Sequence, residues 1–331
     1  MVKFSILGLP DFQYFPLDLL PFDLGRGVRV LRGPANEFLN DETVGHWRSI
    51  LGSLDWDSFR NRRAFLHITI ESENAANDQV NQKLSLILQD AYLALMICAP
   101  LRCQYTSAIL ISGFGRTTNN LVNDGTVGTV TKYKSWGESH FMYSNEYHRH
   151  QHWTYLRSVE LLNDWRRIFL GLRSLRSKRN KKSAISLGVA ALQLGLESQY
   201  LDFRIPLFVR AAETIMAPKK NRTKQQFIDR SLALLRNGSA PLFLKRGVRL
   251  RVLLDDLFEI RNGSVHGMPF GSKVRTKTKK KENLWRYEYL AEECARRSLR
   301  FAISNRDLIK ASLDRARLEN WAEQYWDSAL D

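Results

Sequence analysis

The hydrophobic period of the chain changes at about residue 153, and this change limits the possible folds more than any other feature. Beyond that point, apolar residues recur every three or four positions, the spacing that gathers them on one face of an α-helix. Seven segments have this spacing: 153–176, 183–198, 202–216, 223–236, 248–262, 285–311 and 312–329. Helices of these lengths with short connectors predict an all-α helical bundle over residues 151–331.

Residues 1–150 contain both the alternating spacing of apolar residues that is typical of strands and the three- to four-residue spacing that is typical of helices. Residues 65–70 alternate between two faces, as in a β-strand, and residues 106–112 and 126–133 are rich in the β-branched and aromatic side chains that favour strands. A helix is expected from the polar residues at 74 to about residue 98. The first 150 residues therefore predict an α+β domain with one small sheet and a helix packed on it.

The charge of the chain is distributed unevenly. Residues 1–150 hold 14 Lys and Arg against 15 Asp and Glu, a balance of −1, whereas residues 151–331 hold 36 against 19, a balance of +17. An apolar fraction of 44% and a charged fraction of 25% exclude a disordered chain. All the excess positive charge lies in the helical half, which points to a polyanionic partner. A basic surface that only aids solubility is the simpler interpretation.

The cysteine content and the hydropathy of the chain indicate the cellular compartment in which the protein is expected. Cys98, Cys103 and Cys294 have no metal-ligand spacing and are odd in number, which favours free thiols in a reducing compartment. Residues 84–99 form the most apolar window but are too few to span a bilayer, so they predict a buried helix. The N-terminus does not resemble a signal peptide. We expect a cytoplasmic protein with no membrane partner.

Segment 254–267 holds the main candidate site. Its sequence is LDDLFEIRNGSVHG, a helix-like run that ends on Arg261 and Asn262. We expect Gly263 to interrupt this helix, with His266 following before a second glycine. Arg remains protonated at physiological pH and binds phosphate, and His exchanges a proton near neutrality. Arg and His together at a break in the backbone predict phosphodiester chemistry without a metal or other cofactor.

The pattern Arg-Asn-x-x-x-His resembles the signature of HEPN domains, and the trailing Gly267 is most similar to the Apea-like branch of that family. Residues 200–218, YLDFRIPLFVRAAETIMAP, resemble the family's earlier helix, with Glu213 in its acidic position. The resemblance covers about residues 180–312. It implies a helical bundle, RNA cleavage by a homodimer, and a role in bacterial defence or as a toxin, with a regulatory partner or a phage-derived trigger.

Two interpretations of the motif stay open. In the simpler one, Arg261 and Asn262 cap a helix end and His266 is incidental. In the functional one, the ribose 2′-hydroxyl attacks the adjacent phosphorus while His266 moves the proton. Arg261 then stabilises the charge on the phosphoryl oxygens and Asn262 orients the phosphate or the imidazole. DNA lacks this hydroxyl, so RNA is the expected partner. Glu213 is a candidate for holding Arg261 or the imidazole in place.

A basic run begins seven residues after His266. Such runs are usually solvated loops, but this one is close enough in sequence to hold the backbone of an RNA strand. The candidate RNA-binding residues are Lys273, Arg275, Lys277, Lys279, Lys280 and Lys281.

Glu146, His148, His150 and His152 alternate, so on a strand they would share one face and could ligate zinc. No cysteine lies nearby and metal sites usually draw on more than one segment, so we predict no metal site.

Two functions therefore remain. The first is a metal-independent endoribonuclease of HEPN type, with residues 1–150 as a sensing or regulatory domain. The second is a non-catalytic nucleic-acid-binding or scaffold protein that keeps an HEPN-like bundle, because a fold alone does not establish catalysis. The presence of Arg261, Asn262 and His266 together favours the enzyme.

Overall fold

The computed structural model describes residues 2–9, 16–34, 48, 53–71, 78–98, 107–115, 128–134, 159–177, 183–198, 200–236, 250–265 and 284–327. The chain divides into two compact units, the first with a sheet and helices and the second mostly helical. An α+β region followed by a helical region is thus confirmed. The boundary predicted near residue 150 stays a prediction, because residues 135–158 lie outside the described residues.

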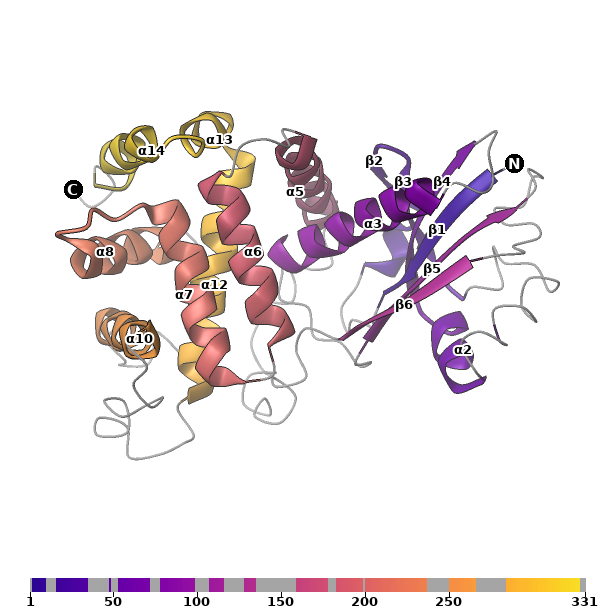
Figure 1. Cartoon of the computed structure of the whole chain (residues 1–331), viewed down its shortest axis with the longest axis horizontal. Coiled ribbons are helices and arrows are strands. Elements are labelled where there is room, and N and C mark those ends of the chain that lie inside the picture. The colour runs from indigo at the N-terminus through magenta and orange to yellow at the C-terminus, as the bar shows by residue number, and fades with distance from the viewer. Residues whose placement is uncertain are drawn as a thin grey trace. The chain divides into compact units, whose positions relative to one another are not determined.

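The first unit is built on an antiparallel sheet with the strand order β2-β3-β4-β1-β5-β6 (Figure 1). Every neighbouring pair in this sheet runs antiparallel. A short 3₁₀ turn, η1 (Leu17–Leu19), precedes β2. The strands are β1 (Val2–Gly8), β2 (Phe22–Gly25), β3 (Val28–Arg32), β4 (Ala64–Glu71), β5 (Ser107–Gly115) and β6 (Gly128–Lys134).

Three of these strands were not predicted from the periodicity. Strand β1 is central, and Ile6 and Leu7 point to opposite faces yet are both buried, so the segment has no apolar–polar alternation. The turn between β2 and β3 requires positive φ at three consecutive residues, 91° at Gly25, 54° at Arg26 and 79° at Gly27. Glycine adopts such angles without strain, which explains the Gly-Arg-Gly sequence.

Helix α3 (Asp78–Cys98) packs on β1, β4 and β5, and its residues from Ala91 to Cys98 are all buried, so the predicted buried helix is confirmed. The first unit also contains α2 (Ser53–Arg60) and α5 (Val159–Ser177) as far as Ser174. The indole of Trp165 donates to the carbonyl of Ala91 at 2.6 Å, and Arg173 pairs with the buried Asp90 at 2.8 Å. These contacts join α5 to α3.

The second unit is organised around helix α7 (Leu201–Met216), which packs against α6, α10 and α12 (Figure 1). The predicted helices over 183–198, 202–216 and 223–236 are confirmed. The other elements are α6 (Ala184–Glu197), α8 (Thr223–Arg236), α10 (Leu250–Val265), α12 (Leu284–Ser304), α13 (Arg306–Ala311), α14 (Arg315–Ala322) and the π-helical turn η6 (Glu323–Asp327).

Three predicted helix boundaries are wrong. Helix α10 runs through Gly263 to Val265, because a single glycine inside a helix costs only about 1 kcal/mol. The helix expected over 285–311 divides at Asn305, whose side chain accepts from the backbone N–H groups of Asp307 and Leu308 and so begins a new helix. The helix expected over 312–329 begins only at Arg315, capped by Asp314.

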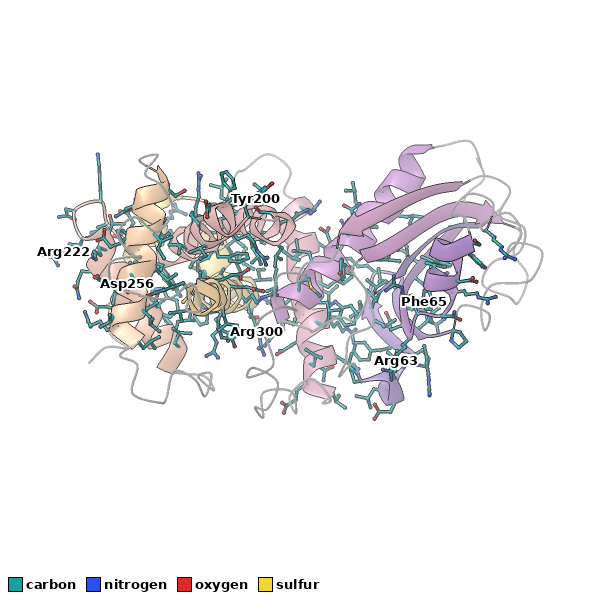
Figure 2. All side chains as sticks on the ribbon, turned by 90° about the horizontal axis from the view of Figure 1, so that it is seen from below. Arg63, Phe65, Tyr200, Arg222, Asp256 and Arg300 are labelled. Carbon is teal, nitrogen blue, oxygen red and sulfur yellow. The ribbon has the colours of Figure 1, made fainter. Side chains whose placement is uncertain are left out.

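Buried polar contacts fix α7, α10 and α12 relative to one another. Arg204 on α7 and Glu288 on α12 form an ion pair at 2.9 Å, with each side chain only 3% exposed. The hydroxyl of Tyr287 donates to Asp256 of α10 at 2.9 Å, and Figure 2 marks Asp256 within this unit. Because buried charges are costly unless paired, these contacts specify how the three helices pack.

Candidate active site on helices α7 and α10

The central contact of the candidate site joins Arg261 on α10 to Glu213 on α7. The Nε and Nη2 atoms of Arg261 both donate to the Oε2 atom of Glu213, at 3.1 Å and 2.9 Å. The two residues are 48 positions apart in sequence and meet because α10 packs along α7. Glu213 therefore lies against Arg261, one of the two groups that the sequence suggested it would hold.

The Glu213 carboxylate is almost removed from solvent, with 9% of its side chain exposed. Burial raises its pKa, while the positive charges of Arg261, Arg210 and Arg315 act in the opposite direction. Its Oε1 atom is buried and has no hydrogen-bond partner within the described part of the chain. The carboxylate thus keeps one free acceptor position beside the guanidinium.

Arg261 keeps donors for a ligand. Its side chain is 28% exposed, its Nη1 donates to Oδ1 of Asn262 at 3.0 Å, and its guanidinium lies 5.8 Å from the centre of the Phe258 ring. A guanidinium has five N–H groups, and three of them are used by Glu213 and Asn262. The other two have no partner among the described residues.

Sequence reasoning singled out Glu213, Arg261 and Asn262, and these three lie together. It missed Phe258 and Arg210, although the sequence spacing of both residues could have identified them. Each lies three residues before a candidate, Phe258 before Arg261 and Arg210 before Glu213, a spacing that places side chains on one face of a helix. Arg315 lies on α14 and had no such signal.

The remaining candidates lie outside the described residues. These are His266, the next residue after the end of α10, and the basic residues Lys273, Arg275, Lys277, Lys279, Lys280 and Lys281. Their proposed roles stay predictions.

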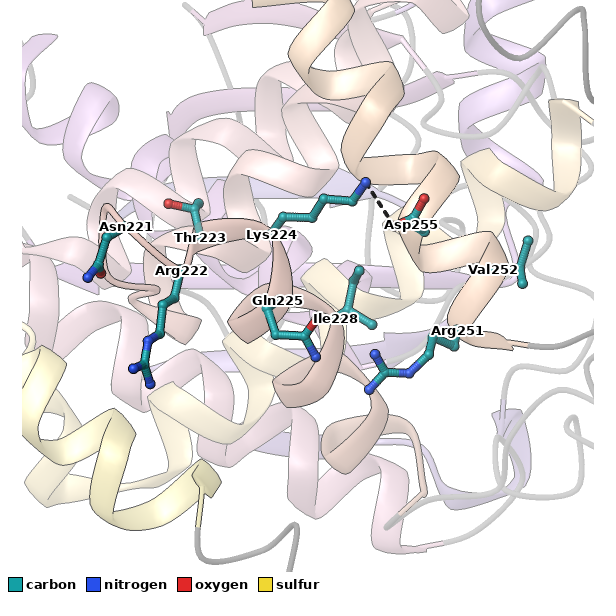
Figure 3. Close-up of a pocket in the computed structure, with 9 residues that line it drawn as sticks. All are labelled: Asn221, Arg222, Thr223, Lys224, Gln225, Ile228, Arg251, Val252 and Asp255. Atoms are coloured by element: carbon teal, nitrogen blue, oxygen red, sulfur yellow. Dashed lines mark ion pairs between the residues drawn. The ribbon is translucent and has the colours of Figure 1, made fainter.

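A surface pocket of about 590 Å³ lies elsewhere on the second unit, between the start of α8 and the first turns of α10 (Figure 3). Its cationic walls are largely neutralised. Lys224 pairs with Asp255 at 2.9 Å and with Glu259 at 2.7 Å, and Arg251 pairs with Asp229. Arg261 and Asn262 do not line it. We therefore assign the candidate site to the Arg261–Glu213 contact and not to this pocket.

Metal binding stays untested for the alternating histidines, because Glu146, His148, His150 and His152 lie outside the described residues. Among the residues that are described, no group of three or more His, Cys, Asp or Glu could hold a metal ion. The thiols of Cys98 and Cys294 are both buried, and burial raises the pKa of Cys294 to about 12. No helix in the described ranges has the length and hydropathy needed to cross a bilayer.

The chain matches no family model, and no curated protein or solved structure is significantly similar to it. The motif and the geometry around Arg261 are therefore what indicates a function.

Proposed function

We propose that this chain is a metal-independent endoribonuclease of HEPN type. The observation that supports this proposal best is the contact of Arg261 with Glu213, which holds a permanent cation at the end of α10, immediately before the segment that carries His266. A guanidinium fixed by a buried carboxylate is preorganised, and preorganised charge is what stabilises a developing oxyanion.

In the proposed reaction, the ribose 2′-hydroxyl attacks the adjacent phosphorus and the bond to the 5′-oxygen breaks. The products are a 2′,3′-cyclic phosphate and a 5′-hydroxyl. His266 takes the proton from the 2′-hydroxyl or delivers one to the leaving oxygen, and the two free N–H groups of Arg261 bind the phosphoryl oxygens. Proton transfer of this kind contributes about 10²–10⁴ in rate, and each positioned donor about 10²–10³.

One imidazole cannot serve as base and acid at once on opposite sides of the phosphorus. We propose that two chains pair, so that two motifs line one cleft and the second His266 supplies the missing proton transfer. The basic run 273–281 then holds the backbone of the RNA strand by phosphate contacts. Residues 1–150 are the proposed sensing or regulatory region.

A comparison of purified wild-type protein with His266→Ala on single-stranded RNA in EDTA tests this function. The wild type should cleave, and the variant should lose at least about 100-fold in rate while keeping the same melting temperature. RNA binding without any product from the wild type would instead support the non-catalytic scaffold.

A further inference from the structure

Arg210 is a second exposed cation beside the contact of Arg261 with Glu213. It lies on α7 one turn before Glu213, a spacing that puts the two side chains on one face of the helix. The positive charges of Arg261, Arg210 and Arg315 all act on the Glu213 carboxylate. A single buried carboxylate therefore has three guanidinium groups within electrostatic range.

Arg210 is the member of this group whose charge is in excess. Arg261 donates to Glu213 from two nitrogen atoms, and Arg315 donates to Glu319 at 2.5 Å. Arg210 is exposed and makes no hydrogen bond or ion pair with any residue that the structure describes. The carboxylate of Glu213 is already bound by Arg261, so it cannot also neutralise Arg210.

Other arginines on α7 and on α12, which packs against it, differ from Arg210 in this respect. They have carboxylate partners: Arg204 with Glu288, Arg296 with Glu292, and Arg297 with Glu293. Such pairs join two helices or stabilise one helix. Arg210 makes no contact of either kind among the described residues, so its side chain is available to a ligand and the fold does not require it.

A strand of nucleic acid is the ligand that suits this arrangement. Guanidinium groups bind phosphate with charge-assisted hydrogen bonds. A small anion on Arg261 would leave the charge of Arg210 without a counter-charge. A nucleic-acid strand carries one negative charge for each nucleotide, so a strand with one phosphate on Arg261 brings further phosphates near it. Two exposed cations on neighbouring helices can then bind two phosphates of one strand.

We propose that Arg210 forms a second phosphate subsite, which binds the backbone phosphate next to the one on Arg261. The inference rests on the proposed function and deepens it, because it states that the RNA strand passes from the end of α10 to the exposed face of α7. Arg210 is then a binding residue that sets the position of the strand. It takes no part in the proton transfers.

Binding of the full chain to a single-stranded RNA in which every 2′-hydroxyl is methylated tests this subsite. Such a strand keeps its phosphates but lacks the nucleophile, so it binds without being cleaved. Arg210→Ala should weaken the affinity by about two- to fivefold, as expected for an exposed ion pair. It should also reduce the slope of log affinity against log salt by about 0.7. Arg210→Lys keeps the charge and should keep the slope.

Arg166→Ala is the matched control. Arg166 is also exposed, lies in the middle of helix α5 and has no partner in the described part of the chain, but it belongs to the first unit. This variant should bind as the wild type does, and all three variants should keep the wild-type melting temperature. An unchanged slope in Arg210→Ala, an equal loss in Arg166→Ala, or a wild type that does not bind the methylated RNA would overturn the proposal.

The length of the substrate separates the subsite from the nuclease activity. A dinucleoside monophosphate has a single phosphate, so it cannot occupy both sites. The ratio of kcat/KM for a longer RNA to that for the dinucleoside should fall about two- to fivefold in Arg210→Ala and stay constant in Arg166→Ala. An unchanged ratio in Arg210→Ala would contradict the subsite. Binding through Arg210 without cleavage of either substrate would refute the nuclease and support the subsite.

Discussion

Arg261 donates from two of its nitrogen atoms to a single oxygen of Glu213, and the other oxygen of that buried carboxylate has no partner among the described residues. In the proposed site, Glu213 would act as a positioning residue. The carboxylate binds the guanidinium through Nε and Nη2, and two of the five N–H groups of Arg261 have no partner among the described residues. The packing of α10 on α7 and the proposed site share this contact, so stability and RNA cleavage are measured separately in its variants.

Arg261→Ala should lower the free energy of unfolding by about 1.5–3 kcal/mol, because it removes charge-assisted hydrogen bonds and leaves Glu213 buried without its cation. The double variant with Glu213→Gln should recover part of this loss, since no buried charge is then left unpaired. Chemical denaturation of the two single variants and the double variant measures the coupling. If Arg261→Ala is as stable as the wild type, the contact does not hold the two helices together.

Glu213→Gln should reduce RNA cleavage by about 10–100-fold, the usual effect of removing a group that orients a functional side chain. Arg261 would keep its charge but lose its fixed position. The reduction should be smaller than in the double variant with Arg261→Ala, which removes the guanidinium as well. Full activity in Glu213→Gln would show that the position of Arg261 does not matter.

The buried His67 should make the first unit sensitive to acid. Burial, with a smaller contribution from Arg29, lowers the pKa of His67 from 6.5 to about 4. The unfolded chain therefore takes up this proton before the folded chain, and stability is lost as the pH falls from about 6.5 to about 4, by about 3 kcal/mol. His67→Leu should flatten the pH dependence in that window. An equally steep pH dependence in the variant would assign it to other groups.

Replacing only one member of the Arg204–Glu288 ion pair should strongly destabilise the second unit. Arg204→Met should cost about 3–5 kcal/mol because it leaves a carboxylate buried, whereas the double variant with Glu288→Leu should be close to the wild type. The pair of Lys310 and Asp307 is the control, with side chains 76% and 79% exposed, and Lys310→Ala should change stability by less than about 1 kcal/mol. Equal effects at the two sites would contradict the buried geometry.

The basic run should set the salt dependence of RNA binding. Replacing Lys277, Lys279, Lys280 and Lys281 with Ala should reduce the slope of log affinity against log salt by up to about 2.8, at about 0.7 for each phosphate that a lysine no longer neutralises. Lys310→Ala provides a control for exposed charge remote in sequence. An unchanged slope would identify the run as a solvated loop.

Sequence periodicity located α6, α7 and α8 well, because each of these helices has one face in the core and one in solvent. It failed at β1, which is buried on both faces, and at the turn around Arg26, where positive φ decides the structure. It also failed at Gly263, since a glycine weakens a helix without ending it. Whether a strand is buried on both faces, or a helix continues through a glycine, depends on packing against distant parts of the chain, which local sequence patterns do not show.

The candidate site could be predicted only in part. The motif identified Arg261 and Asn262, and the resemblance pointed to Glu213. The contact between α7 and α10 spans 48 residues, so no local spacing could have established it. Likewise, the raised pKa of Glu213 follows from burial by the whole unit. The role of His266 remains a prediction.

The most direct measurement compares two oligonucleotides of the same sequence in EDTA, one all-ribose and one with a single 2′-deoxyribose at the scissile position. We predict that the wild type cleaves the first, leaving a 2′,3′-cyclic phosphate, and does not cleave the second. His266→Ala should cleave neither. Cleavage of the deoxy-substituted strand, or undiminished cleavage by His266→Ala, would contradict 2′-hydroxyl attack assisted by Arg261 and His266.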